Sequence, residues 1–160
     1  MSVRQWVFET NSSSMHSFSF YGEPEYGTIQ VSPEGYVEIE FGEYGWWYDK
    51  YTNPIDKACY IATGLFNSEY PWKDDMVEYP RADGLYEYKG DSPKILKFEE
   101  AIKDQTNCKV VLYRLYNKLW EWSEYGYIDH QSSDLWQDMF ADLRESIFRR
   151  GTLEIDNDNH

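Results

Sequence analysis

The order of apolar and polar residues predicts β-strands in the first part of the chain. Residues 3–8 form a short apolar-rich run, and residues 15–21 alternate between two faces, as strands do. Two further strands are predicted at 28–31 and 36–41, on either side of Ser32-Pro33-Glu34-Gly35, a good turn sequence. In the strand at 36–41 an acidic face alternates with an apolar face, so that one side is wet and the other buried.

Helical periodicity takes over after residue 53. Asn53-Pro54 and Ser92-Pro93 each place a capping residue before a proline at the first helical position, which predicts helices over 54–66 and 93–105. The longest apolar stripe predicts a third helix over 134–149, and Gly151 is expected to end it in a left-handed conformation.

The remaining segments complete a prediction of fold class. The β-branched run 108–115 is typical of a central strand, 152–155 suits an edge strand, and 68–91 lacks a regular pattern. Strands followed by segregated helices predict an α+β fold, with a mostly antiparallel sheet packed by about three helices. The length favours one domain over residues 1–160.

Charge narrows the range of partners. The chain has 15 basic and 29 acidic residues, a net charge of −14, and no Lys or Arg lies between Arg4 and Lys50. Such a surface repels nucleic acid and phospholipid and attracts basic proteins, although acidity also serves solubility alone. The acidic residues expected to bind a basic partner are Glu34, Glu38, Glu40, Glu43, Asp49, Asp134, Asp138 and Asp142.

Other composition features set the class of protein. The 7 Trp and 15 Tyr suit protein interfaces, and they equally suit the covering of sheet faces. There is no apolar run near 18 residues and no secretory leader, so a soluble, intracellular protein is expected. Cys59 and Cys108 are isolated and are expected to be reduced core thiols.

Two polar clusters hold the candidate catalytic residues, and they contain both internal histidines. The first runs over 9–17 and the second over 129–133, just before the third predicted helix. If the two loops meet, they form a general-base or small metal site whose candidate residues are His16, His130, Asp129, Glu9 and Ser14. In the alternative, the histidines satisfy backbone groups and cap the helix. No nucleotide, zinc or cofactor motif occurs, and no cofactor is expected.

Residues 7–17, Val-Phe-Glu-Thr-Asn-Ser-Ser-Ser-Met-His-Ser, resemble the opening of a group of small proteins from bacteriophages and their bacterial hosts. A later Ile-Asp-His pattern of that group corresponds here to Ile128-Asp129-His130. The resemblance implies a phage or prophage origin and brings no established activity.

Two functions are therefore expected, and the sequence leaves the choice open. In the first, a small acidic phage-type protein in the cytoplasm of the host bacterium occludes the basic, nucleic-acid-binding surface of a host protein, such as a defence nuclease. In the second, the 9–17 and 129–133 loops form a hydrolytic or metal-dependent enzyme. Neither hypothesis fixes the oligomeric state.

Overall fold

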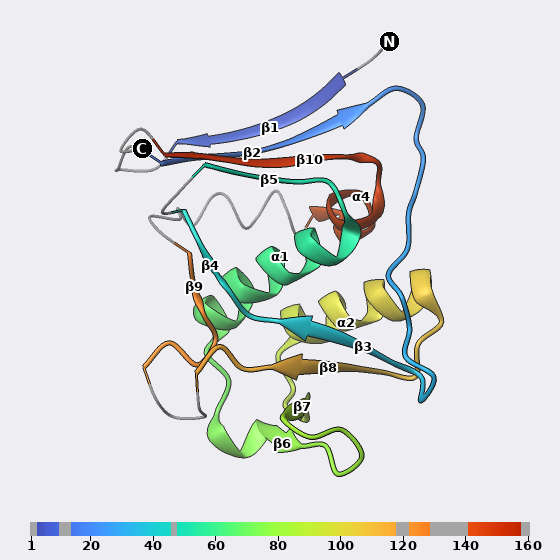
Figure 1. The fold of residues 1–160 in the computed structure, drawn as a ribbon, viewed down its shortest axis with the longest axis vertical. Coiled ribbons are helices and arrows are strands. Elements are labelled where there is room, and N and C mark those ends of the chain that lie inside the picture. The colour runs from blue at the N-terminus through green and yellow to red at the C-terminus, as the bar shows by residue number, and fades with distance from the viewer. Residues whose placement is uncertain (1–2, 10–13, 46–47, 118–121, 129–140, 158–160) are drawn as a thin grey trace.

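The strands form two separate sheets with helices between them, in an α+β fold (Figure 1). A computed structural model describes residues 3–9, 14–45, 48–117, 122–128 and 141–157. Within these residues the strands make two four-stranded sheets and a two-stranded ribbon. The α+β class is confirmed, and the single sheet expected from the sequence is divided into two. No helix of the described part combines the length and the apolar character needed to cross a bilayer.

The first sheet joins the two ends of the chain and is antiparallel throughout. Its order is β1-β2-β10-β5, with bounds Val3–Glu9, Ser14–Tyr21, Gly151–Asn157 and Asp49–Tyr51. The strand expected at an edge over 152–155 is instead an inner strand, paired on both sides. Its Leu153 and Ile155 are fully buried, which suits that inner position.

The second sheet holds the acidic strand. Its order is β3-β8-β7-β6, with bounds Tyr36–Glu40, Val110–Arg114, Leu85–Tyr88 and Met76–Glu78. The central strand predicted at 108–115 is confirmed as β8, and β3 pairs with it in parallel. Strands β6 and β7 lie within 68–91, where no regular structure was expected, and the strand predicted at 28–31 does not form. The ribbon pairs β4 (Glu43–Tyr44) with β9 (Tyr127–Ile128).

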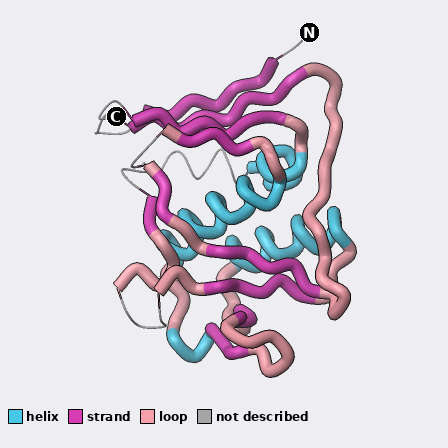
Figure 2. The backbone as a smooth tube through the Cα atoms, viewed as in Figure 1, coloured by secondary structure: helices cyan, strands magenta, loops and turns pink. Residues whose placement is uncertain are grey.

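The two long helices begin where the sequence places them. Helix α1 spans Pro54–Glu69 and α2 spans Pro93–Thr106, and both lie between the sheets (Figure 2). Ser92 caps α2, its hydroxyl accepting from the Ile95 amide, whereas Asn53 makes no side-chain cap. A short 3₁₀ turn, η1 (Lys73–Asp75), follows α1.

The third helix is shorter than the sequence predicts. Helix α4 spans Leu143–Phe148, and Asp142 before it has extended backbone angles, so the predicted helix over 134–149 is interrupted there. The Asp142 carboxylate accepts from the Glu145 amide at 3.2 Å. An aspartate favours such an N-cap over the helix interior, which is the physical reason for the break. Residues 129–140 of the prediction lie outside the described residues.

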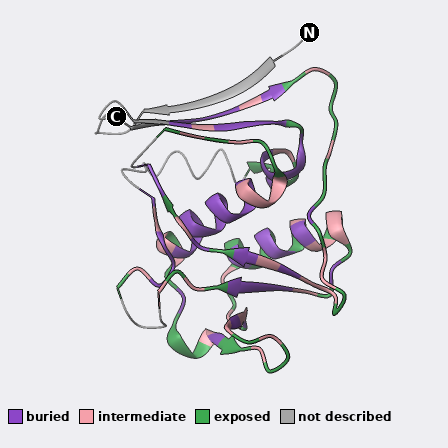
Figure 3. Ribbon diagram, in the orientation of Figure 1, coloured by how far each residue is buried: buried purple, intermediate pink, exposed green. Residues whose placement is uncertain are grey.

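Helix α1 is largely buried (Figure 3), and its aromatic side chains form the centre of the core. Tyr60 packs against Phe18 of the first sheet, and Phe66 packs against Tyr113 of the second, with ring centroids 4.7 Å apart. All four are buried, as are Cys59 and Cys108, which are free thiols. Helix α1 therefore joins both sheets into one core.

Gly151 has a different role from the one expected. Its backbone is not left-handed, and it lies in β10 rather than after a helix. A β-carbon there would lie 2.2 Å from the Ser19 carbonyl oxygen. Glycine is therefore required for the close approach of β10 to β2.

Gly126, just before β9, lies directly against Gly42, just before β4, and Gly126→Ala is expected to destabilise the protein by more than about 2 kcal/mol. Its φ is +71°, and a β-carbon would lie 2.2 Å from the Gly42 carbonyl oxygen. Gly22 is a matched control, since its φ is +62° with nothing within 4 Å. Gly22→Ala is expected to lose only about 1 kcal/mol, the cost of the left-handed backbone. Equal losses in urea unfolding would disprove the role of close approach.

Candidate protein-binding surface

His16, one of the candidate catalytic residues, is a core residue. It lies in β2 with none of its surface exposed, and its Nδ1 shares a hydrogen bond of 2.6 Å with the Tyr60 hydroxyl. Burial lowers the pKa of His16 to about 4, so the imidazole is neutral at pH 7. It is therefore inaccessible to a substrate in this structure, and its Nδ1 bonds a side chain of helix α1.

The other residues of that candidate site are only partly described. Glu9 ends β1 opposite Met15, and Ser14 begins β2 opposite Asn157. Asp129 and His130 lie outside the described residues, so the convergence of the two loops stays a prediction. Within the described part of the chain, no group of three or more His, Cys, Asp or Glu side chains is placed to hold a metal ion.

The acidic face of β3 is partly neutralised by β8. The Arg114 guanidinium donates to both carboxylate oxygens of Glu38, at 3.1 and 3.4 Å, and lies 3.9 Å from Glu40. The hydrogen bond to Arg114 lowers the pKa of Glu38, and the neighbouring Glu38 raises the pKa of Glu40. The two carboxyl groups therefore share one cation. The Glu40 side chain is the more exposed of the two.

The remaining predicted binding carboxylates have separate positions. Glu34 is exposed in the turn before β3, Glu43 is exposed in β4, and Asp49 is half-buried in β5. Asp142 is exposed and caps α4. Asp134 and Asp138 lie outside the described residues. Glu38 and Glu40 thus share β3 in the second sheet, whereas Glu43 lies in the two-stranded ribbon and Asp49 in the first sheet.

Exposed aromatic residues lie after α1 and after β8, and one of them lies near Glu43. Trp72 and Trp122 are 82% and 81% exposed, and Tyr70 is 56% exposed. Tyr116, also exposed, follows β8, and its pKa is raised by desolvation and by the nearby Glu43 carboxylate. Exposed tryptophans are uncommon because of the apolar area they leave in water, and interfaces are enriched in them.

Hydrogen bonds join Tyr70, in the segment after α1, to the residues near Tyr116 and Trp122. The Tyr70 hydroxyl, just after α1, donates to Glu124 Oε1 at 2.7 Å, and the Tyr116 amide donates to the Glu124 carbonyl at 2.9 Å. The ring of Tyr125 packs edge-on against that of Tyr70, with centroids 5.5 Å apart. Asn117 donates to the Trp122 carbonyl at 2.6 Å. We call the exposed side chains Tyr70, Trp72, Tyr116 and Trp122 the aromatic surface.

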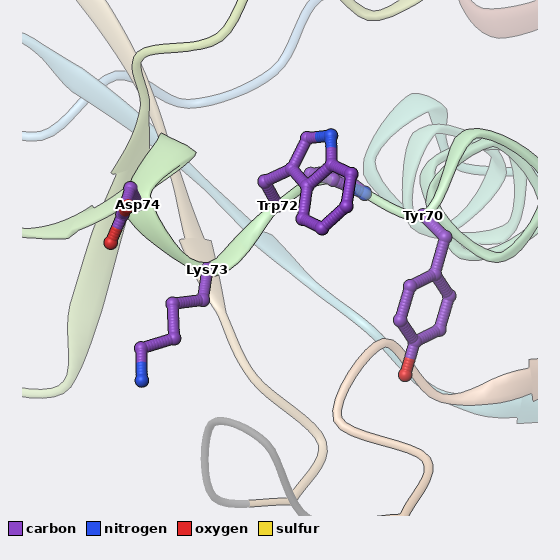
Figure 4. Close-up of a pocket in the computed structure, with 5 residues that line it drawn as sticks. Tyr70, Trp72, Lys73 and Asp74 are labelled. Atoms are coloured by element: carbon purple, nitrogen blue, oxygen red, sulfur yellow. The ribbon is translucent and has the colours of Figure 1, made fainter.

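A pocket of about 580 Å³ opens within this surface (Figure 4). The described residues that line it are consecutive, Tyr70 to Asp74, so it lies where the chain leaves α1 and enters η1. Tyr70 is the left-handed cap of α1, with φ of 45°, and its amide donates to the Phe66 carbonyl. The abrupt end of the helix, followed by Pro71, turns the next side chain out of the core.

The aromatic surface was missed by pattern analysis. Trp72 lies in 68–91, where no periodicity marks a buried or an exposed side, and Trp122 lies in a turn. The available signal was an isolated tryptophan directly after a helix end and a proline. In a periodic segment such a residue would belong to the core.

Comparison with known proteins does not add to this description. No protein-family model, curated protein or solved structure matches the chain.

Proposed function

We propose that this protein binds the basic surface of another protein and occludes the nucleic-acid-binding site there. The observation that carries the proposal is the set of exposed aromatic side chains, one of which, Tyr116, lies near the exposed carboxylate of Glu43, in a chain with a net charge of −14. Aromatic side chains supply the desolvated centre of an interface, and carboxylates supply attraction to a cationic partner.

The charge of the chain supports a protein partner over nucleic acid. Exposed aromatic rings also stack on bases, but single-strand binding needs a positively charged groove for the backbone. On the second sheet, Arg114 is already paired with Glu38. The field of the whole chain repels phosphate and accelerates the approach of a basic surface.

The resemblance of residues 7–17 to phage proteins indicates what kind of partner is involved. A phage-type protein acts in the host bacterium, where nucleases of defence systems carry basic surfaces for DNA. Carboxylates on the consecutive strands β3 and β4 present negative charge to such a surface in place of phosphates. Binding of this kind weakens as salt rises.

The proposal is tested by release of DNA from a defined basic protein. Protamine, an arginine-rich polypeptide, is bound to a short fluorescent DNA duplex, and the protein is titrated in. Release of the duplex is expected, and Glu40→Lys with Glu43→Lys is expected to raise the half-maximal concentration about tenfold or more, because two attractions become repulsions. Fluorescence anisotropy measures the release.

A matched variant separates the surface from net charge alone. Glu100 and Asp104 are exposed on α2, so Glu100→Lys with Asp104→Lys makes the same change in net charge elsewhere. This control is expected to release DNA nearly as well as the unmodified protein. Equal loss in the two double variants would mean that only total charge matters, and absence of release by the unmodified protein would reject the proposed function.

A further inference from the structure

A buried carboxylate lies behind the aromatic surface without a basic partner. Glu124 is 1% exposed, and its side chain accepts a hydrogen bond from the Tyr70 hydroxyl. Among the described residues, no lysine or arginine pairs with it. A carboxylate attracts a cation more strongly when less water lies between them, so this position favours the approach of a cation.

Tyr70 connects Glu124 to the pocket, because it lines the pocket and its hydroxyl donates to the Glu124 carboxylate. Its hydroxyl proton is directed to Glu124, which leaves the lone pairs of the oxygen free to accept from a ligand. The same hydrogen bond raises the pKa of Tyr70, so the phenol stays neutral. A neutral ring with a carboxylate at its edge attracts a cation to its face.

The pocket offers a second ring. Trp72 and Tyr70 border it, and the Lys73 side chain extends away from both rings (Figure 4). Pro71 is buried between them and fixes the backbone. Lys73 also lines the pocket, and so does the acidic residue Asp74 that follows it.

We propose that this pocket receives an arginine side chain of the basic partner. The inference rests on the proposed function and names the group that the partner inserts. A guanidinium is planar and weakly hydrated, so it stacks on Trp72 while an N–H donates to the Tyr70 oxygen. A lysine ammonium is compact and strongly hydrated and gains less from a flat aromatic wall.

The test uses three labelled peptides of alternating glycine with arginine, lysine or citrulline, with affinity measured by fluorescence anisotropy. The arginine peptide is expected to bind several-fold more tightly than the lysine peptide, and the neutral citrulline peptide weakest. Trp72→Ala is expected to weaken the arginine peptide about fivefold or more. Glu124→Gln, which keeps a hydrogen-bond acceptor, is expected to reduce the preference of arginine over citrulline.

Leu96→Ala is the control, because Leu96 is an exposed apolar side chain on α2. It is expected to leave all three affinities unchanged. If Glu124→Gln does not fold, Tyr70→Phe removes the accepting oxygen and tests the same step. Equal binding of arginine and citrulline peptides, or full affinity in Trp72→Ala, would overturn the inference. The proposed function would still stand if Trp72→Ala released DNA normally, and it fails separately if the unmodified protein releases none.

Discussion

Replacing Phe66 by alanine is expected to destabilise the protein by about 3–5 kcal/mol. The Phe66 ring is fully buried and lies 4.7 Å from the ring of Tyr113, 4.9 Å from that of Phe41 and 5.4 Å from that of Tyr125. Truncation leaves a cavity among rings that cannot all move to fill it, so transfer energy and packing are both lost. Urea unfolding followed by circular dichroism measures the change.

Trp72→Ala provides the contrast. The same kind of substitution at a side chain that is 82% exposed removes little packing and is expected to change stability by less than about 0.5 kcal/mol. A loss of several kcal/mol would show that Trp72 is packed rather than available to a partner. The two variants together distinguish an effect on folding from an effect on binding. Phe66 packs on Tyr125, and Tyr125 packs on Tyr70, so a loss at Phe66 reaches the aromatic surface only through the fold.

Sequence patterns predicted the elements whose signals are local. Ser92-Pro93 starts α2, because a capping hydroxyl and a proline need no distant partner. The alternation in β3 correctly assigns Val37 and Ile39 to the core. Asn53 lies at the predicted N-cap position but makes no side-chain hydrogen bond, so the position was predictable and the contact was not.

Local sequence patterns could not predict which strands pair when they lie far apart in the chain. The parallel pairing of β3 with β8 joins strands separated by both long helices, and no local signal sets its direction. The inner place of β10 depends on β5 and β2, which lie far away in sequence. The pairing of Glu38 with Arg114 follows from the same register, so the partial neutralisation of the acidic face was equally hidden.

The candidate catalytic site shows the same difference between local signals and long-range packing. A histidine in a polar cluster suggests chemistry, but the alternation of residues 15–21 turns His16 inward with Phe18 and Phe20. The inward position alone would have predicted a core residue. The identity of its partner, Tyr60, required the packing of α1 on the first sheet.

The second large effect expected is on the pH dependence of stability, to which the buried groups His16 and Glu99 contribute in opposite directions. Burial lowers the pKa of His16 from 6.5 to about 4, so this contribution to stability is complete above pH 6.5 and is lost as pH falls toward 4. Burial raises the pKa of Glu99 from 4.5 to about 7, opposed by Tyr113 and Lys103 and reinforced by Glu87. The Glu99 contribution is therefore complete below pH 4.5 and is lost as pH rises through 7.

Glu99→Gln is expected to remove the pH dependence that Glu99 contributes to stability and to leave that of His16 in place. Between pH 4.5 and 6.5 the two slopes oppose each other, and each group accounts for about 3 kcal/mol over its full range. Glutamine can still accept from the Tyr113 hydroxyl, which is 2.7 Å from the carboxyl oxygen, and it cannot ionise. The stability of the variant relative to the unmodified protein should therefore rise by about 3 kcal/mol from pH 4.5 to 7.5. Urea unfolding at several pH values measures this difference, in which all shared carboxylates cancel. A constant difference for Glu99→Gln would show that Glu99 titrates as it does in the unfolded chain.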